Sequence, residues 1–103
     1  MRGALHEDDA TKSEIYRILA DGTRRRILAS LSEEGTTTVP TLIAGITDGS
    51  NWGTTEVSLH HNHLPKMENA GLIAYDDAGD LGLTNLGERA ESIRRCAVDV
   101  LRQ

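Results

Sequence analysis

Residues 54 to 83 read TTEVSLHHNHLPKMENAGLIAYDDAGDLGL, and this stretch decides the fold. Its first half carries apolar or weakly polar residues at spacings of three and four, which is the period of one buried helix face. These positions are Val57, His60 or His61, Leu64, Met67 and Gly71. Gly71 is expected to end the helix in a left-handed backbone conformation. The opposite face of the helix, about residues 54–70, is then free to meet a partner.

The second half of the stretch predicts a β-hairpin. Two short runs with strand character, residues 72–75 and 81–83, flank the turn-forming segment 76–80, which reads DDAGD. A helix followed at once by a hairpin is typical of a winged helix-turn-helix. We therefore predict a mainly α fold with a small β-hairpin wing.

The remaining elements follow from local patterns. Apolar periodicity predicts helices over 11–20, 23–33 and 40–46, with Asp21 as the N-cap of the second and Gly35 as its end. Thr36 to Val39 is β-prone and predicts a third strand, and residues 47–53 predict a loop. Thr84 or Asn85, with Glu88, fits the start of a last helix. We expect one domain over 11–103 after a flexible segment, 1–10.

The last helix predicts a homodimer. Leu86, Ala90, Ile93, Ala97 and Leu101 form one apolar stripe, longer than a minimal three-helix core can cover. The residues expected at the interface, from the first and last helices, are Ile15, Leu19, Ile93, Cys96, Ala97 and Leu101. The alternative is that the stripe packs on the first helix of its own chain.

Composition limits the possible functions. The chain has 103 residues, 11 basic and 16 acidic, and a net charge of −5, which is unusual for a protein that binds nucleic acid. Only two of the basic residues are lysines, and an acidic surface poor in lysine suits a salt-rich cytoplasm. No apolar run is long enough to cross a bilayer and no signal peptide is evident, so we expect a soluble cytoplasmic protein. The single cysteine excludes a disulfide within the chain.

Three motifs resemble ArsR-type winged-helix transcriptional regulators. Residues 19–31, LADGTRRRILASL, look like that family's second helix with Gly22 in place of the usual proline. Residues 63–73, HLPKMENAGLI, resemble the end of its recognition helix, and residues 83–87, LTNLG, resemble the motif that follows the wing. The chain is similar to small single-domain regulators common in halophilic archaea. The resemblance implies a dimeric DNA-binding fold.

Two departures from that family matter. Its metal sensors carry paired cysteines in the second or recognition helix, and this chain has none there, so we do not expect metal sensing of that type. Wings that contact DNA usually carry Arg or Lys at the tip, whereas this one carries Asp76, Asp77 and Asp80. We therefore do not expect the wing tip to enter a minor groove.

The candidate DNA-binding residues lie on the outward face of the predicted recognition helix. Their short polar side chains can reach base edges, and a lysine one turn later can bind a phosphate. They are Thr54, Thr55, Ser58, His61, Asn62 and Lys66, together with Arg25 from the basic cluster 24–26. The members of that cluster could instead pair with acids such as Glu14 or Asp21, and the helix face could simply be solvated.

Other residues allow further interpretations. His60 and His63 could share a metal ion, but the sequence offers no convincing further ligand, so we predict no metal and no cofactor. Pro65 is expected to bend the helix near His61. Trp52 is expected to cap the core, although it could be an exposed anchor. Cys96 could form a disulfide between chains, or be a small buried apolar residue.

The sequence as a whole predicts a homodimeric DNA-binding transcriptional regulator with its recognition helices about 34 Å apart. An enzyme is not expected, because no nucleophile and base pair, glycine-rich phosphate loop or carboxylate dyad occurs at a usable spacing. Two alternatives stay open. One is a winged helix that binds a protein through its acidic wing or Trp52, and the other is a redox-responsive regulator that uses Cys96.

Overall fold

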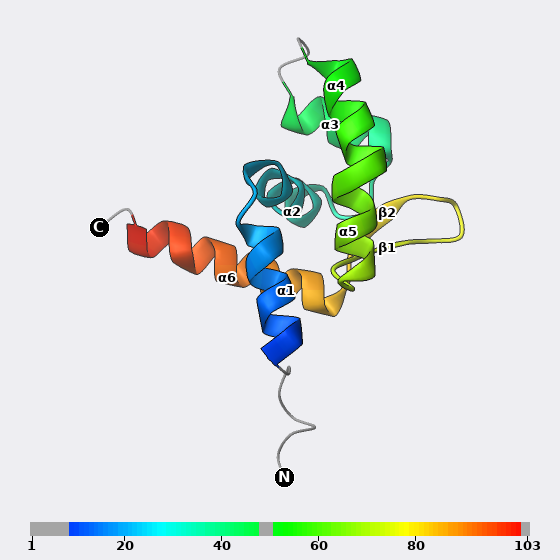
Figure 1. Cartoon of the computed structure of the whole chain (residues 1–103). Coiled ribbons are helices and arrows are strands. Elements are labelled where there is room, and N and C mark those ends of the chain that lie inside the picture. Colours follow the sequence, from blue (N-terminus) through cyan, green and yellow to red (C-terminus); the bar gives the residue numbers. More distant parts are fainter. Residues whose placement is uncertain (1–8, 48–50, 102–103) are drawn as a thin grey trace.

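The computed structural model describes residues 9–47 and 51–101 (Figure 1). These residues are mainly α-helical with one two-stranded antiparallel sheet, so the predicted class is confirmed at that level. The elements are α1 (Asp9–Leu19), α2 (Gly22–Glu34), α3 (Val39–Ile46), α4 (Trp52–Ser58), the π-helical turn η2 (Leu59–His63), α5 (Leu64–Asn69), β1 (Ile73–Tyr75), β2 (Leu81–Leu83) and α6 (Asn85–Leu101).

Two segments that were predicted to be irregular overlap helices in the structure. Helix α1 begins at Asp9, inside the segment predicted to be flexible, and residues 1–8 of that segment lie outside the described residues. The predicted loop 47–53 is wrong at its end, because Trp52 and Gly53 already belong to α4, while residues 48–50 lie outside the described part. Helix α4 leads directly into η2 and α5, and we call this continuous helical segment, residues 52–69, the rod.

Capping side chains set the ends of the body helices. The Asp21 carboxylate accepts hydrogen bonds from the backbone N–H groups of Thr23 (2.8 Å) and Arg24 (3.2 Å), as expected of an N-cap. Gly35 ends α2 with a positive φ of 76°. At α6 the cap is Thr84, whose hydroxyl accepts from the Gly87 N–H at 3.0 Å. The capping box led by Asn85 is therefore wrong, and its competitor Thr84 is used.

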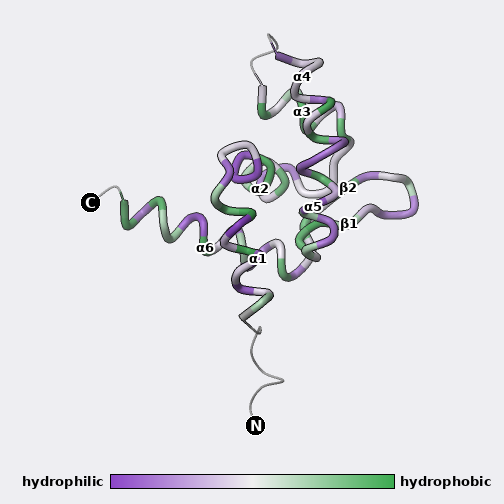
Figure 2. The backbone as a smooth tube through the Cα atoms, in the orientation of Figure 1, coloured by the Kyte–Doolittle hydropathy of each residue, from purple (hydrophilic) through white to green (hydrophobic). Residues whose placement is uncertain are grey.

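The core is aliphatic and centres on α2. Ile27, Leu28 and Leu31 of α2 are buried between α1, α3 and α6. Figure 2 shows hydrophobic residues recurring along α6 as far as its C-terminal end, well beyond the body of the molecule. Leu101 near that end is 83% exposed. The first half of the apolar stripe on α6 thus packs within the chain and the second half does not.

The hairpin follows the predicted limits. Ile73 pairs with Leu83 and Tyr75 with Leu81, and the Asp76 carboxylate closes the turn by accepting from the backbone N–H groups of Ala78 (2.9 Å) and Asp80 (3.0 Å). The predicted third strand is only partly right. It consists of one isolated bridge between Thr37 and Leu81, because Val39 already begins α3.

Helix α6 is fixed to the body by two features. Gly87 lies against Leu72, the residue before β1, and a Cβ atom at this position would come within 2.0 Å of the Leu72 carbonyl oxygen. Glu91, 3% exposed, accepts hydrogen bonds from Arg94 Nε (2.7 Å) and Nη2 (2.8 Å), and the hydrogen bond raises the pKa of Arg94. Arg95 joins the pair to α2 through the Ser32 hydroxyl at 2.7 Å. These contacts leave the C-terminal part of α6 projecting from the molecule (Figure 1).

Candidate nucleic-acid interface

The rod presents a different face to the core than its sequence predicted. Leu59, His63, Leu64 and Met67 are buried, whereas Val57 is 60% exposed and His60 and His61 are exposed. The predicted inward face was therefore right at Leu64 and Met67 and wrong at Val57 and at the position offered to His60 or His61. His61 is exposed, as expected of it as a candidate DNA-binding residue.

The π-helical turn η2 explains the error. The Leu64 N–H donates to the carbonyl of Leu59, five residues earlier, so this turn contains an extra residue and the helical register shifts across it. Pro65 follows at once and cannot donate a backbone hydrogen bond. The irregularity predicted near His61 from Pro65 takes the form of this π turn. A regular helical spacing of three and four, counted back from Leu64 through η2, therefore places Val57 on the buried side, where the structure has Leu59 instead.

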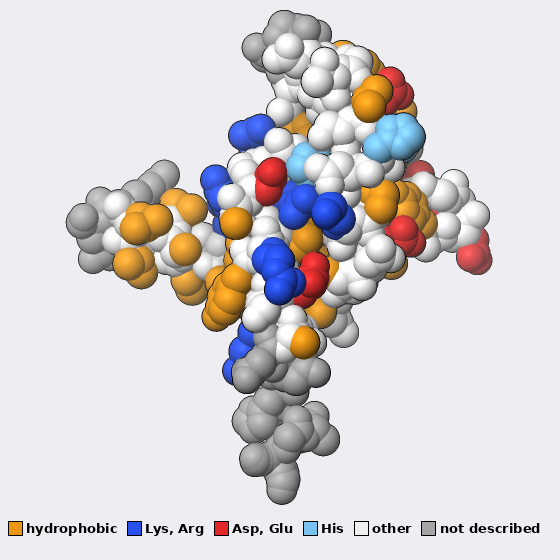
Figure 3. Space-filling view, viewed as in Figure 1, with side chains coloured by type: hydrophobic (Ala, Val, Ile, Leu, Met, Phe, Trp, Pro, Cys, Tyr) orange, Lys and Arg blue, Asp and Glu red, His pale blue; other side chains and the backbone are white. Residues whose placement is uncertain are grey.

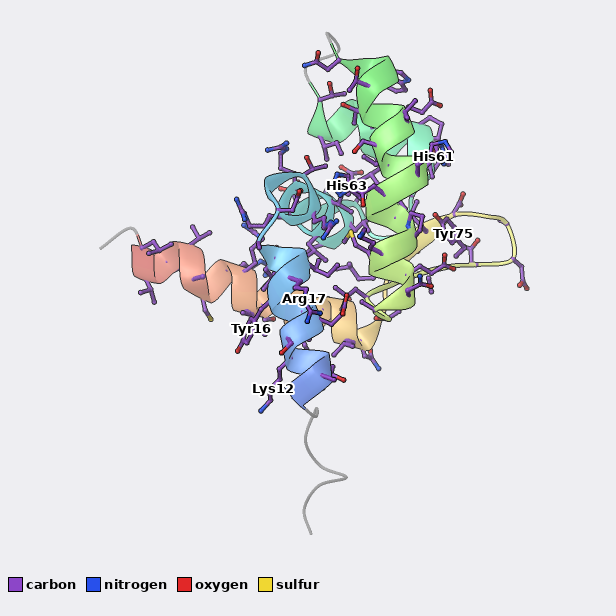
Figure 4. All side chains as sticks on the ribbon, viewed as in Figure 1. Lys12, Tyr16, Arg17, His61, His63 and Tyr75 are labelled. Carbon is purple, nitrogen blue, oxygen red and sulfur yellow. The ribbon has the colours of Figure 1, made fainter. Side chains whose placement is uncertain are left out.

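Two rows of side chains line the rod away from the core. Val57, His61 and Pro65 are exposed and four residues apart, so they follow one another along one side. A second row at the same spacing consists of Ser58, Asn62 and Lys66, of which Lys66 is exposed and the other two are half-buried. Figure 4 shows His61 on the side of the rod away from α2 and His63 on the side toward it.

The predicted DNA-binding residues of the rod therefore lie on one continuous helical segment but differ in how far they are exposed. Thr54 is exposed and Thr55 is half-buried, and both line a hollow with Ser58 whose other wall includes Thr23 and Arg26 of α2. Arg25 lies on α2 rather than on the rod, and its guanidinium donates to the Leu19 carbonyl at 2.7 Å. The alternative partner Glu14 pairs with Arg17 at 2.9 Å.

Arg24 connects the rod to α2 by hydrogen bonds, and no sequence pattern predicted this contact. Its Nε donates to His63 Nδ1 at 2.9 Å and its Nη2 to Asn62 Oδ1 at 3.5 Å. Because Arg24 is always a cation and a donor, His63 must be the neutral tautomer with its proton on Nε2. The partners lie 39 residues apart, beyond the reach of any local pattern.

Burial and charge keep His63 neutral. Burial lowers the pKa of His63 below its ordinary value of 6.5, and the charges of Arg24 and Lys66 lower it further, against the opposing effect of Asp21. For Asp21, burial pushes the pKa upward, but the backbone hydrogen bond from Arg24 and the nearby His63 and Arg24 outweigh it, so its pKa is lowered. His63 thus serves as a hydrogen-bond acceptor inside the protein. Within residues 9–47 and 51–101, no three His, Cys, Asp or Glu side chains gather to hold a metal ion.

Charge is unevenly distributed around the rod. Figure 3 shows Lys and Arg side chains over α1, α2 and the adjoining side of the rod, and carboxylates at the end of the hairpin. The hairpin carboxylates are Asp76 and Asp77, which are exposed, and Asp80, which is half-buried. Tyr75 is the last residue of β1, next to the turn of the hairpin, and burial, with Glu68 nearby, raises its pKa.

One comparison with known protein families matches the part of the chain that contains the rod and α2. A family model matches residues 16–81, which run from α1 through the rod to β2. The chain belongs to this family, described as a domain of unknown function, DUF7344. No curated protein matches the chain. No solved structure matches it either. The matched region includes Arg24, His63 and the whole rod, whereas α6 lies beyond it.

Two other predictions fail at the single-chain level. Trp52, expected to cap the core, is the first residue of α4 and is 38% exposed. Cys96 is exposed, so its interpretation as a buried apolar residue does not hold within one chain.

Of the predicted interface residues, Ile15 is buried in the chain's own core and Leu19 is half-buried, whereas Ile93, Cys96, Ala97 and Leu101 are exposed. Among the described residues, no helix is both long and apolar enough to span a lipid bilayer.

Proposed function

We propose that this DUF7344 protein is a DNA-binding transcriptional regulator with a winged helix-turn-helix fold of the ArsR type. In this proposal α3 and the rod form the helix-turn-helix, and the rod is the recognition helix that enters the major groove. The observation that carries the proposal is the rod itself. One side is held on the body of the molecule by the buried Leu59, His63, Leu64 and Met67, and His63 accepts a hydrogen bond from Arg24 of α2. Another side is exposed along its length, at Thr54, Val57, His61 and Pro65.

The exposed side of the rod and its half-buried edge toward α2 have the chemistry that base reading requires. Thr54 and His61, which are exposed, and Ser58, which is half-buried, offer hydroxyl and imidazole groups that can donate to or accept from base edges. The Asn62 side chain accepts from Arg24 through its oxygen, which leaves its NH₂ group to donate. Lys66, one turn later, is suited to a phosphate contact. An α-helix fits the width of the major groove, so such a rod can present all of these groups at once.

A homodimer would supply the second half of the interface. The C-terminal half of α6 exposes Ile93, Cys96, Ala97 and Leu101 on a helix that projects from the body (Figure 1). Pairing of two such helices would remove these apolar groups from water and place the two rods in successive major grooves, about 34 Å apart.

The net charge of −5 shapes the expected binding behaviour. Few cations are available to displace counterions from DNA, and several of them already serve the protein, as Arg24 and Arg94 do. We therefore expect base contacts and shape to contribute more of the affinity than phosphate contacts, and a shallow dependence of affinity on KCl. A cytoplasm rich in salt is the setting that such a surface suits.

Two exposed features favour protein binding as a second candidate function. The exposed Trp52 and the acidic hairpin tip offer groups that a protein partner could bind, so a winged helix without DNA-binding activity is the main alternative. Exposed Cys96 leaves a redox-responsive regulator as a further variant of the DNA-binding proposal.

Selection of duplexes from a random DNA pool by the purified protein tests the proposal. We expect enrichment of one motif, and weaker binding of that duplex by Asn62→Ala and Ser58→Ala in fluorescence anisotropy. Asn69→Ala is the matched control, because Asn69 is an exposed asparagine near the other end of the rod. Unchanged binding by the first two variants, or no enriched motif, would favour the protein-binding alternative. A KCl series on the selected duplex checks the shallow salt dependence.

A further inference from the structure

Val57 occupies the middle of the exposed side of α4. It lies three residues after Thr54 and four before His61, both of which are exposed, and its own side chain is 60% exposed. Leu59, two residues later, takes the core position instead and is completely buried. A single exposed apolar residue is common on protein surfaces, so exposure alone indicates nothing. The position of Val57 among the polar groups proposed to read bases is the informative feature.

The surroundings of Val57 exclude a broad hydrophobic contact. Glu56, His60 and His61 around it are exposed and polar. Trp52, the other exposed apolar residue of α4, lies five residues away, which places it about 140° around the helix. The exposed neighbours of Val57 are therefore polar, which favours contact with one small apolar group over a broad hydrophobic interface.

One apolar group in the major groove matches a lone valine side chain. Thymine presents its C5 methyl there, beside the hydrogen-bonding groups of all four bases, and small apolar side chains distinguish it by contact. Val57 shares a surface hollow with Gly53, Thr54 and Ser58. Because Gly53 has no side chain, the hollow is open next to the Val57 methyls, and the two hydroxyls border it.

We infer that Val57 reads thymine by packing against its C5 methyl group, and so determines part of the base specificity of the rod. This inference rests on the proposed function. Thr54 and Ser58 would bind neighbouring base edges while Val57 contacts the methyl group. The recognised site must then contain thymine at one position in each half-site, and removal of that single methyl group must weaken binding.

Replacement of thymine by deoxyuridine tests the inference, because it removes the methyl group and leaves base pairing intact. The probe is the duplex selected from the random pool by the wild-type protein, with each thymine replaced in turn. We expect one position per half-site at which deoxyuridine weakens wild-type binding about fourfold, the change that corresponds to burial of one methyl-sized group. Val57→Ala should bind the thymine duplex more weakly and distinguish less between the two duplexes.

A matched variant separates this effect from general damage. Val100→Ala makes the same change at an exposed valine on α6, far along the chain from the rod, and should keep the fourfold preference. Two results overturn the inference while leaving DNA binding intact: a selected motif that tolerates deoxyuridine everywhere, or the same preference for thymine in Val57→Ala and wild type. Failure to enrich any motif overturns the proposed function, and the inference with it.

Discussion

The two ends of the rod differ in how they are held. None of the seven residues of α4, all of them described, is buried, whereas η2 and α5 bury Leu59, His63, Leu64 and Met67. The C-terminal part is bound to the core and to Arg24, and the N-terminal part extends past it (Figure 1).

In one continuous helical segment, η2 and α5 therefore contribute to stability, while α4 is available for recognition. Side chains after Ser58 set the position of the rod on α2, so changes there should unfold or loosen the domain. Side chains of α4, before Leu59, are not buried, so changes there should affect stability less and can alter ligand binding. The π turn between the two parts is the element that turns Val57 outward and Leu59 inward, and so makes the division possible.

The largest effect is expected from Met67→Ala. Met67 is completely buried, and truncation of a large core side chain to alanine typically costs about 2–5 kcal/mol. Val57→Ala, at the other end of the rod, should change the free energy of unfolding by less than about 0.5 kcal/mol. Urea denaturation followed by circular dichroism measures both. Similar losses in the two variants would contradict the division of the rod.

Local signals predicted much of this fold. Asp21 at the start of α2, Gly35 at its end and the turn at 76–80 are set by neighbours within a few residues, and all three lie where the sequence indicates. The motif LTNLG also has a local meaning, since Thr84 caps α6 and Gly87 leaves room for the Leu72 carbonyl.

The features that the sequence did not predict depend on distant contacts or on a change of helical period. The register of the rod before Leu64 depends on η2, and a periodic pattern cannot indicate where one residue is inserted. The contact between Arg24 and His63 joins α2 to the rod across 39 residues, and the buried Glu91 is explained only by the arginines that fold onto it. The prediction that Trp52 is buried was wrong because α4, where Trp52 is the first residue, buries none of its side chains, and a large apolar side chain does not ensure burial.

A smaller loss of stability is expected from Arg24→Ala. The change leaves the Nδ1 atom of buried His63 without its donor, and an unsatisfied buried polar group costs about 1–3 kcal/mol. Arg25→Ala is the control, because it removes the neighbouring guanidinium, which is exposed and donates to the carbonyl of Leu19, the last residue of α1. Hydrogen exchange should show faster exchange in residues 59–69 of Arg24→Ala only. Equal behaviour of the two variants would mean that apolar burial alone holds the rod.

The same contact predicts a dependence of stability on pH. The pKa of His63 is lower in the folded state than its ordinary value of 6.5, so the unfolded chain binds the extra proton first. Stability is therefore full above about pH 6.5 and declines as the pH falls from there toward the folded pKa. Burial lowers the pKa of His63, Asp21 raises it, and Arg24 and Lys66 lower it further. The pKa of Asp21 is itself lowered, so its effect on stability falls in a separate, more acidic range.

His63→Asn should remove this decline, because the asparagine oxygen can accept from Arg24 in place of Nδ1 and does not titrate. Urea midpoints between pH 5 and 8 compare the variant with the wild type. His60→Asn is the control, since His60 is exposed on the same turn, and it should keep the decline of the wild-type protein. A decline that survives His63→Asn would assign the pH dependence to other groups.

The smallest effect on stability, and the sharpest contrast, is expected from Thr54→Ala. Thr54 is exposed in α4, and alanine has a higher helix propensity than threonine, so the variant should be more stable by a few tenths of a kcal/mol, at most about 0.7 kcal/mol. Binding to the selected duplex should nevertheless weaken several-fold, because a hydroxyl that contacts a base edge is lost. Urea denaturation and fluorescence anisotropy on one preparation measure the two quantities. A protein that folds better and binds worse cannot owe its weaker binding to misfolding, so this result would place Thr54 at the DNA contact, and unchanged binding would remove it from there.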